Sequence, residues 1–188
     1  MSYLFLIRHA LTKKTEKPPE TWPLSLTGQK DSVELAEKKF WRDVEIIFSS
    51  PESKAYSTAQ PASRQWNIPI QINSCLREVH RPYLVEDYKT TVARFFSSPE
   101  KSIREWEPAS QATTRIKECI RNILSIHSKK NLAVVSHGLI LTLFLADLEN
   151  RNPIVEEWSI IPFPGVAIID SDKGTLIQPW ENPANIPD

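Results

Sequence analysis

The chain begins MSYLFLIRHALT, residues 1–12, and this stretch decides what fold we expect. An apolar run from Tyr3 to Ile7 stands directly before the polar pair Arg8 and His9. Apolar runs of about five residues are typical of buried strands, because buried helices need longer runs. We therefore expect a buried strand whose carboxyl end presents a fixed cation and a titratable imidazole.

Further strand-like runs follow, with helical patterns between them. With the first, they are YLFLI (3–7), VEIIFS (44–49), IPIQIN (68–73), LAVVS (132–136) and GVAIID (165–170). This alternation predicts an α/β fold: a mostly parallel central sheet with helices on both faces. We expect a single domain over residues 1–188, because the length suits one core and neither the loop at 12–23 nor the Pro-containing tail at 178–187 divides it.

Several helix ends and faces can be assigned from local signals. Ser25 stands where an N-cap is expected, Asn67 can adopt the left-handed turn that ends a helix, and Ser110 is expected to cap the helix that follows it. Two apolar helix faces are predicted from three/four spacing: Val33, Ala36 and Phe40, and Ala112, Ile116, Cys119, Ile120 and Ile123.

The composition excludes some classes of function. Lys plus Arg (23) equals Asp plus Glu (23), which does not favour a nucleic-acid or polybasic membrane binder. The longest later apolar run, at 138–148, is shorter than the roughly 20 residues that span a bilayer, so it predicts a buried helix. The apolar start is too short for a signal-peptide h-region and follows no basic segment. We expect a cytoplasmic protein.

The two cysteines, Cys75 and Cys119, have no CxxC spacing. This argues against a disulfide framework and against a structural zinc site, and it favours a reducing compartment.

Polar residues follow several of the predicted strands, where open parallel sheets bind ligands. They are Arg8 and His9 after the first, Lys54 after the second, Glu78 after the third, and Ser136, His137 and Gly138 at the end of the fourth. Any one of them alone has a structural explanation. Together they suit phosphoryl transfer, in which a neutral imidazole attacks phosphorus, cations stabilise the oxygens and an acid protonates the leaving group. Gly138, at the start of an apolar helix, would offer backbone N–H groups to an anion.

Five blocks of sequence carry a resemblance to a known family. RHALT (8–12), PLSLTG (23–28), SSPESKAYSTA (49–59), LREV (76–79) and SHG (136–138), in this order, resemble the histidine phosphatase superfamily, which has the phosphoglycerate mutase-like fold. The resemblance implies that His9 accepts the phosphoryl group, that Arg8 and His137 hold its oxygens, and that Glu78 donates the proton. It also implies that no metal or organic cofactor is needed.

Two positions depart from the family pattern. Ala10 stands where the family usually has glycine, and Lys54 stands where it usually has arginine, so a point charge replaces a planar two-pronged donor. We expect Thr12, Lys54 and Gly138 to contact the substrate. A carbonyl should accept a hydrogen bond from one ring nitrogen of His9 and fix its tautomer.

The segment at about 79–110 is expected to form a small cap that faces the substrate. Val85, Tyr88, Val92 and Phe95 keep helical spacing there and predict packing. Arg81 and Arg104 are the expected substrate contacts, with solvation at the surface as the alternative for both.

The sequence thus predicts a phosphatase that hydrolyses a phosphomonoester through a phosphohistidine intermediate. The expected partner is a small phosphorylated metabolite, with a phosphorylated protein side chain less favoured. One alternative is a phosphoglycerate-type mutase, although mutases of this type resemble longer chains with a larger insertion after the acid. The other is a phosphate-binding protein with weakened catalysis. The oligomeric state cannot be read from the sequence.

Overall fold

A computed structural model describes residues 1–82 and 85–186. Within this part, six strands form one sheet in the order β3-β2-β4-β1-β5-β6. The strands are β1 (Tyr3–Arg8), β2 (Ile46–Ser49), β3 (Ile70–Ile72), β4 (Leu132–Ser136), β5 (Gly165–Asp170) and β6 (Thr175–Glu181). The pairs β1–β4, β2–β4 and β2–β3 are parallel, while β5 is antiparallel to both β1 and β6. The expected mostly parallel sheet is confirmed.

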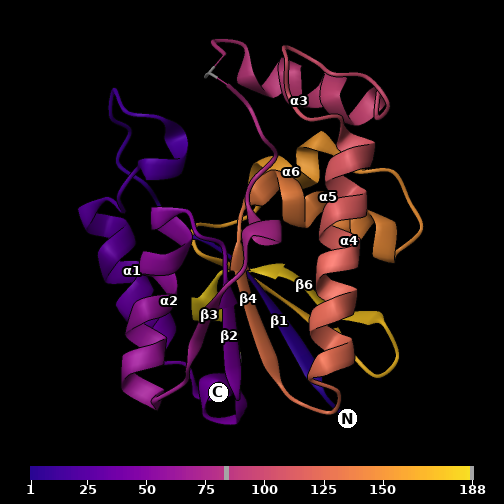
Figure 1. Ribbon diagram of the computed structural model, residues 1–188. Coiled ribbons are helices and arrows are strands. Elements are labelled where there is room, and N and C mark those ends of the chain that lie inside the picture. The colour runs from indigo at the N-terminus through magenta and orange to yellow at the C-terminus, as the bar shows by residue number, and fades with distance from the viewer. Residues whose placement is uncertain (83–84, 187–188) are drawn as a thin grey trace.

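Helices cover both faces of this sheet (Figure 1). They are α1 (Leu26–Ala36), α2 (Ser53–Trp66), α3 (Tyr88–Ser97), α4 (Ala109–Ile126), α5 (Gly138–Leu148) and α6 (Val155–Ile160). Short 3-10 turns are η1 (Pro19–Thr21), η2 (Lys39–Asp43), η3 (Ser74–Leu76) and η4 (Pro183–Asn185).

Alternate residues of β1 enter two different cores, because successive strand side chains point to opposite faces. Leu4 and Leu6 pack in the cluster formed with α3, α4, α5 and α6, whereas Phe5 and Ile7 pack in the cluster formed with α1 and α2. All four side chains are buried, which explains why the strand reads as a continuous apolar run. No helix in the described part of the chain is long and apolar enough to cross a membrane.

Several local predictions are confirmed. The Ser25 hydroxyl accepts a hydrogen bond from the Gly28 amide at 3.0 Å, so Ser25 caps α1. Asn67 ends α2 with a φ of 55°. Gly28 is required for packing, because a Cβ there would stand 2.1 Å from the carbonyl oxygen of Leu11. The PLSLTG block therefore holds α1 directly against the backbone that follows the polar pair.

Other local predictions are wrong. Ser110 does not cap α4, which begins at Ala109 after Pro108 with no side-chain cap. Instead its hydroxyl bonds to Glu100 at 3.1 Å. Val33 does not lie on the buried face of α1 but is 51% exposed. The strand β6 is not among the predicted strands, although it extends into the Pro-containing tail and ends at Glu181.

The cysteines form a disulfide, contrary to expectation. Cys75 in η3 and Cys119 in α4 are bonded, with Cα atoms 5.9 Å apart and a sequence separation of 44. The two cysteines meet because α4 packs against η3. The spacing of residues within a segment does not predict such packing between distant segments.

The expected cap contains α3, which Figure 1 shows beyond the carboxyl ends of the parallel strands. Val92, Phe95 and Trp106 are buried and belong to the same apolar cluster as the sheet, so packing is their role. Residues 83–84 of this segment lie outside the described residues.

Candidate active site

His9 lies at the carboxyl end of β1 and is 7% exposed. Its Nδ1 is 2.8 Å from the carbonyl oxygen of Ala10. A carbonyl can only accept, so Nδ1 carries the proton and Nε2 keeps its lone pair. Burial, followed by the nearby His137, holds the pKa of His9 well below 6.5. The ring is therefore a neutral imidazole with an available nucleophilic nitrogen.

Arg8 is buried beside it and is held by the loop that precedes β5. One terminal nitrogen donates to the carbonyl of Ile161 at 2.6 Å, and the guanidinium lies 3.4 Å from the ring centroid of Phe163. Burial lowers the pKa of Arg8 to about 10, so it remains a cation at neutral pH. A Cβ at Gly138 would stand 3.1 Å from the guanidinium, so glycine leaves room for it.

His137 directly follows β4 and is fully buried, with its ring centroid 5.2 Å from that of His9. Its Nε2 is 2.8 Å from the Ser50 hydroxyl and 3.4 Å from Glu52 Oε1. Burial, with Lys54 next in effect, holds the pKa of His137 well below 6.5. The two histidines are thus neutral neighbours.

Two buried polar atoms at this site have no hydrogen-bond partner in the described chain: Arg8 Nε and His137 Nδ1. Buried polar atoms are rarely left unpaired, since each costs about 1–3 kcal/mol. Both belong to residues that lie beside His9. An oxyanion bound there would satisfy them.

The Glu78 carboxylate lies at the amino end of α5. Oε1 accepts from the Ile140 amide at 2.9 Å and from Val79 at 2.9 Å, and Oε2 accepts from Leu139 at 3.2 Å. The amides that the sequence assigned to a substrate anion therefore bind Glu78 in this structure. A carboxylate at a helix N-terminus is stabilised by the free N–H groups there.

Lys54 is buried near the amino end of α2, but its charge is already paired. The ammonium lies 2.6 Å from Glu52 Oε2 and donates to the Pro19 carbonyl at 2.8 Å. Glu52 also accepts from the Glu78 amide at 2.8 Å. Sequence reasoning missed Glu52, although it stands two residues before Lys54 in one of the quoted blocks.

The other residues expected to contact the substrate, Arg81, Arg104 and Thr12, do not lie together in the structure. Arg81 lines the cavity described next, hydrogen bonds to the Tyr88 hydroxyl and lies over the Tyr88 and Trp106 rings. Arg104 is exposed, in the segment that the sequence predicts to be the cap, and lies 3.6 Å from Asp87. Thr12 pairs through its backbone with Leu24. Neither Arg104 nor Thr12 borders the cavity.

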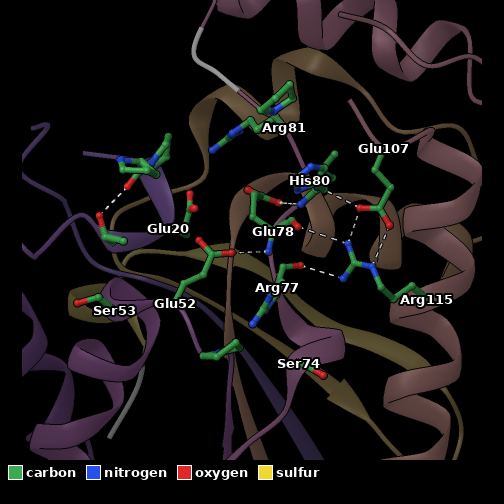
Figure 2. Close-up of a pocket in the computed structure, with 16 residues that line it drawn as sticks. Glu20, Glu52, Ser53, Ser74, Arg77, Glu78, His80, Arg81, Glu107 and Arg115 are labelled. Carbon is green, nitrogen blue, oxygen red and sulfur yellow. Dashed lines mark hydrogen bonds and ion pairs between the residues drawn. The ribbon is translucent and has the colours of Figure 1, made fainter. Parts of the chain in front are cut away.

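A cavity of about 740 Å³ opens beside these residues (Figure 2). The η1 segment, the start of α2 and the 74–82 segment line it, together with two residues that sequence reasoning did not select, Glu107 and Arg115. Its charged walls include Glu52, Glu78 and Arg81. Glu52 lines the cavity and also contacts His137, whereas His9 and His137 are not among the residues that line it. Among the residues described, no group of three His, Cys, Asp or Glu side chains could hold a metal ion.

The fold places two neutral histidines and a carboxylate at the carboxyl edge of the sheet, an arrangement that suits phosphoryl transfer. The sequence profile of the histidine phosphatase superfamily (branch 1) matches residues 4–174. The chain therefore belongs to this superfamily.

Individual relatives agree with this assignment. "Putative phosphoserine phosphatase 2" of Hydrogenobacter thermophilus is 27% identical over 154 residues, covering 73% of this chain and 74% of the relative. Bacillus stearothermophilus YhfR has a TM-score of 0.77 at 21% identity, covering 97% of each chain. A phosphoserine phosphatase of Entamoeba histolytica has a TM-score of 0.77 at 19% identity, covering 97% of this chain and 98% of the other. At these identities the two structures show a shared fold.

Proposed function

We propose that this protein hydrolyses a small phosphorylated metabolite, with His9 as phosphoryl acceptor and Glu78 as proton donor. One observation carries the proposal: neutral His9, with its Nε2 unprotonated, lies beside buried atoms of Arg8 and His137 that have no hydrogen-bond partner among the described residues. Those atoms would hold phosphoryl oxygens, and Glu78 borders the cavity from which an ester would enter.

The reaction would take two steps. The first step starts with Glu78 protonated: His9 Nε2 bonds to phosphorus as the ester P–O bond breaks, and Glu78 gives its proton to the departing oxygen. Then the oxygen of a water molecule bonds to phosphorus as the N–P bond breaks, while Glu78 takes a proton from that water. The products are an alcohol and phosphate, and both side chains return to their first state.

The names of similar proteins support a small substrate. Besides phosphoserine phosphatases, they include a mycobacterial glucosyl-3-phosphoglycerate phosphatase, with a TM-score of 0.75 at 17% identity that covers 90% of this chain and 93% of the other. In this proposal Arg81, which lines the cavity, contacts the leaving group. Arg104 does not line the cavity and instead pairs with Asp87 at the surface. A phosphorylated protein remains the less favoured substrate.

One observation favours weakened catalysis as a second candidate. Glu52 pairs with Lys54 and so removes one positive charge from the region where phosphate would bind. A phosphate-binding protein would keep affinity for phosphate but lack turnover.

A cytoplasmic location stays a proposal. The Cys75–Cys119 disulfide removes the support that the cysteine spacing gave to it.

The test is a screen against phosphoserine, 3-phosphoglycerate, glucosyl-3-phosphoglycerate and a phosphohistidine peptide, in buffer with EDTA. Rapid quenching with labelled substrate should show acid-labile, base-stable label on the wild type. Equal label on His9→Ala would exclude His9 as the acceptor. Binding of phosphate without turnover of any ester would favour the second candidate.

A further inference from the structure

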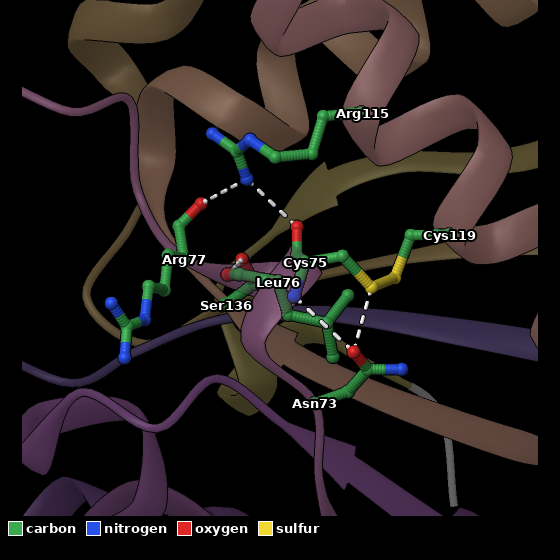
Figure 3. The surroundings of a disulfide bond; sticks show 7 residues. All are labelled: Asn73, Cys75, Leu76, Arg77, Arg115, Cys119 and Ser136. Atoms are coloured by element: carbon green, nitrogen blue, oxygen red, sulfur yellow. Dashed lines mark hydrogen bonds between the residues drawn. A yellow bond between two sulfur atoms is a disulfide. The ribbon is translucent and has the colours of Figure 1, made fainter.

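Arg115 on α4 contacts the backbone of the proposed acid and of the residues before it. One terminal nitrogen donates to the carbonyls of Cys75 (2.8 Å) and Arg77 (3.0 Å), and the other lies 3.4 Å from the carbonyl of Glu78. Figure 3 shows the side chain reaching from α4 to the carbonyls of Cys75 and Arg77. The segment 75–78 therefore depends on one guanidinium for several of its backbone acceptors.

Glu107 completes the arrangement from the other side. Its carboxylate accepts two hydrogen bonds from Arg115, at 2.9 and 2.7 Å, and one from the His80 amide at 3.1 Å. Burial raises the pKa of Glu107, but the hydrogen bonds from Arg115 and His80 outweigh this, so the net shift is downward. Arg115 and Glu107 together hold the chain before and after Glu78 (Figure 2).

Arg115 acts on the Glu78 backbone and not on its carboxylate. The Glu78 amide donates to Glu52, its carbonyl accepts from Arg115, and its carboxylate is bonded to the amides at the start of α5. Three separate elements thus fix one residue. We propose that Arg115 is a positioning residue, which sets where Glu78 presents its proton in the proposed reaction.

Lysine could not do the same work. The planar guanidinium serves a bidentate carboxylate and three carbonyl oxygens at once, whereas an ammonium is a compact donor without that geometry. The inference therefore predicts that keeping the charge alone does not keep the function.

The disulfide makes this inference testable, because it links the 75–78 segment to α4 independently of Arg115. Cys119 lies four residues after Arg115, on the same face of α4, and it is bonded to Cys75. Loss of Arg115 should shift Glu78 without releasing the segment from the helix.

The inference rests on the proposed function, and its experiment uses 4-nitrophenyl phosphate and phenyl phosphate. These esters differ little in shape, but nitrophenolate leaves with little need of a proton while phenolate needs one. Glu78→Gln, Arg115→Ala, Arg115→Lys and Glu107→Gln should each lower kcat/KM for phenyl phosphate on the order of tenfold, and less than about twofold for the nitrophenyl ester. Combining Glu78→Gln with Arg115→Ala should add no further loss. Arg121→Ala, on an exposed part of α4, is the matched control and should resemble wild type.

Other results would overturn the inference. Equal losses on both esters with a lowered Tm would make Arg115 structural, and a raised KM with unchanged kcat would make it a substrate contact. If Arg115→Ala does not fold, the Arg115→Lys and Glu107→Gln variants decide whether Arg115 has a positioning, a structural or a substrate-binding role. A wild type that turns over neither ester would overturn the proposed function, and this inference with it.

Discussion

The Lys54 ammonium lies 2.6 Å from Glu52 Oε2, and the two side chains are only 5% and 9% exposed. A buried cation at this position would be expected to face the phosphoryl group, yet here a carboxylate of the same helix start pairs with it. Substrate binding must therefore compete with Glu52 for Lys54, or proceed without it.

The activity of Lys54 variants tests whether the cation still serves catalysis. Lys54→Ala should lower kcat/KM on the order of 10²-fold, comparable with loss of one preorganised transition-state donor. Arg104→Ala is the control and should stay near wild type, because Arg104 is exposed and away from the cavity. If Lys54→Ala keeps near-normal kcat/KM while Arg81→Ala loses most of it, Arg81 and not Lys54 is the cation that contacts the phosphoryl group.

Removing Glu52 should strengthen phosphate binding. Glu52→Gln deletes a negative charge that lies 3.4 Å from His137 and frees the Lys54 ammonium, so inorganic phosphate should inhibit at several-fold lower concentration. The inhibition constant for phosphate is the measurement. An unchanged or weaker constant would show that Glu52 does not limit anion binding.

The two buried histidines should make stability depend on pH. Both are held neutral in the folded chain, with pKa values well below 6.5, whereas histidines in the unfolded chain bind protons below that value. Stability should therefore fall as pH drops below 6.5, by up to about 1.4 kcal/mol per pH unit for each histidine. Urea unfolding between pH 7 and 5 measures the slope, and His137→Asn should make it shallower. A slope unaffected by this change would contradict the assignment.

The disulfide should contribute substantially to stability. Closing a loop of 44 residues restricts the unfolded chain, which corresponds to about 4 kcal/mol in the chain-entropy account. Reductant should lower the free energy of unfolding of the wild type by this order. The Cys75→Ser/Cys119→Ser double variant is the control and should not respond to reductant. A wild type whose stability is the same with and without reductant would contradict the prediction.

Gly138→Ala should disturb Arg8 without disrupting the fold. The added methyl would stand 3.1 Å from the guanidinium, so the side chain must shift by a few tenths of an ångström. Because small misplacements of binding groups are costly, KM should rise on the order of tenfold. Steady-state kinetics measure KM, and a melting curve checks that the fold is kept. An unchanged KM would show that the Arg8 guanidinium accommodates the added methyl without losing its contacts to substrate.

The sequence by itself determined the central strands and the residues at their ends. Arg8, His9 and His137 could be placed because β1 and β4 are buried on both faces, which leaves continuous apolar runs that end where polar residues begin. The Ser25 cap depends on bonds within four residues and was equally readable. Such signals are local, so periodicity and spacing record them.

Tertiary structure alone decided how those residues are held. The edge strand β6 alternates exposed and half-buried residues and contains Pro179, so its sequence resembles a loop. The Cys75–Cys119 bond and the contacts of Arg115 join segments about 40 residues apart. Glu52 became visible only when its carboxylate was found against Lys54, Glu78 and His137. Contacts of this kind arise when separate elements pack together, and no spacing within one element encodes them.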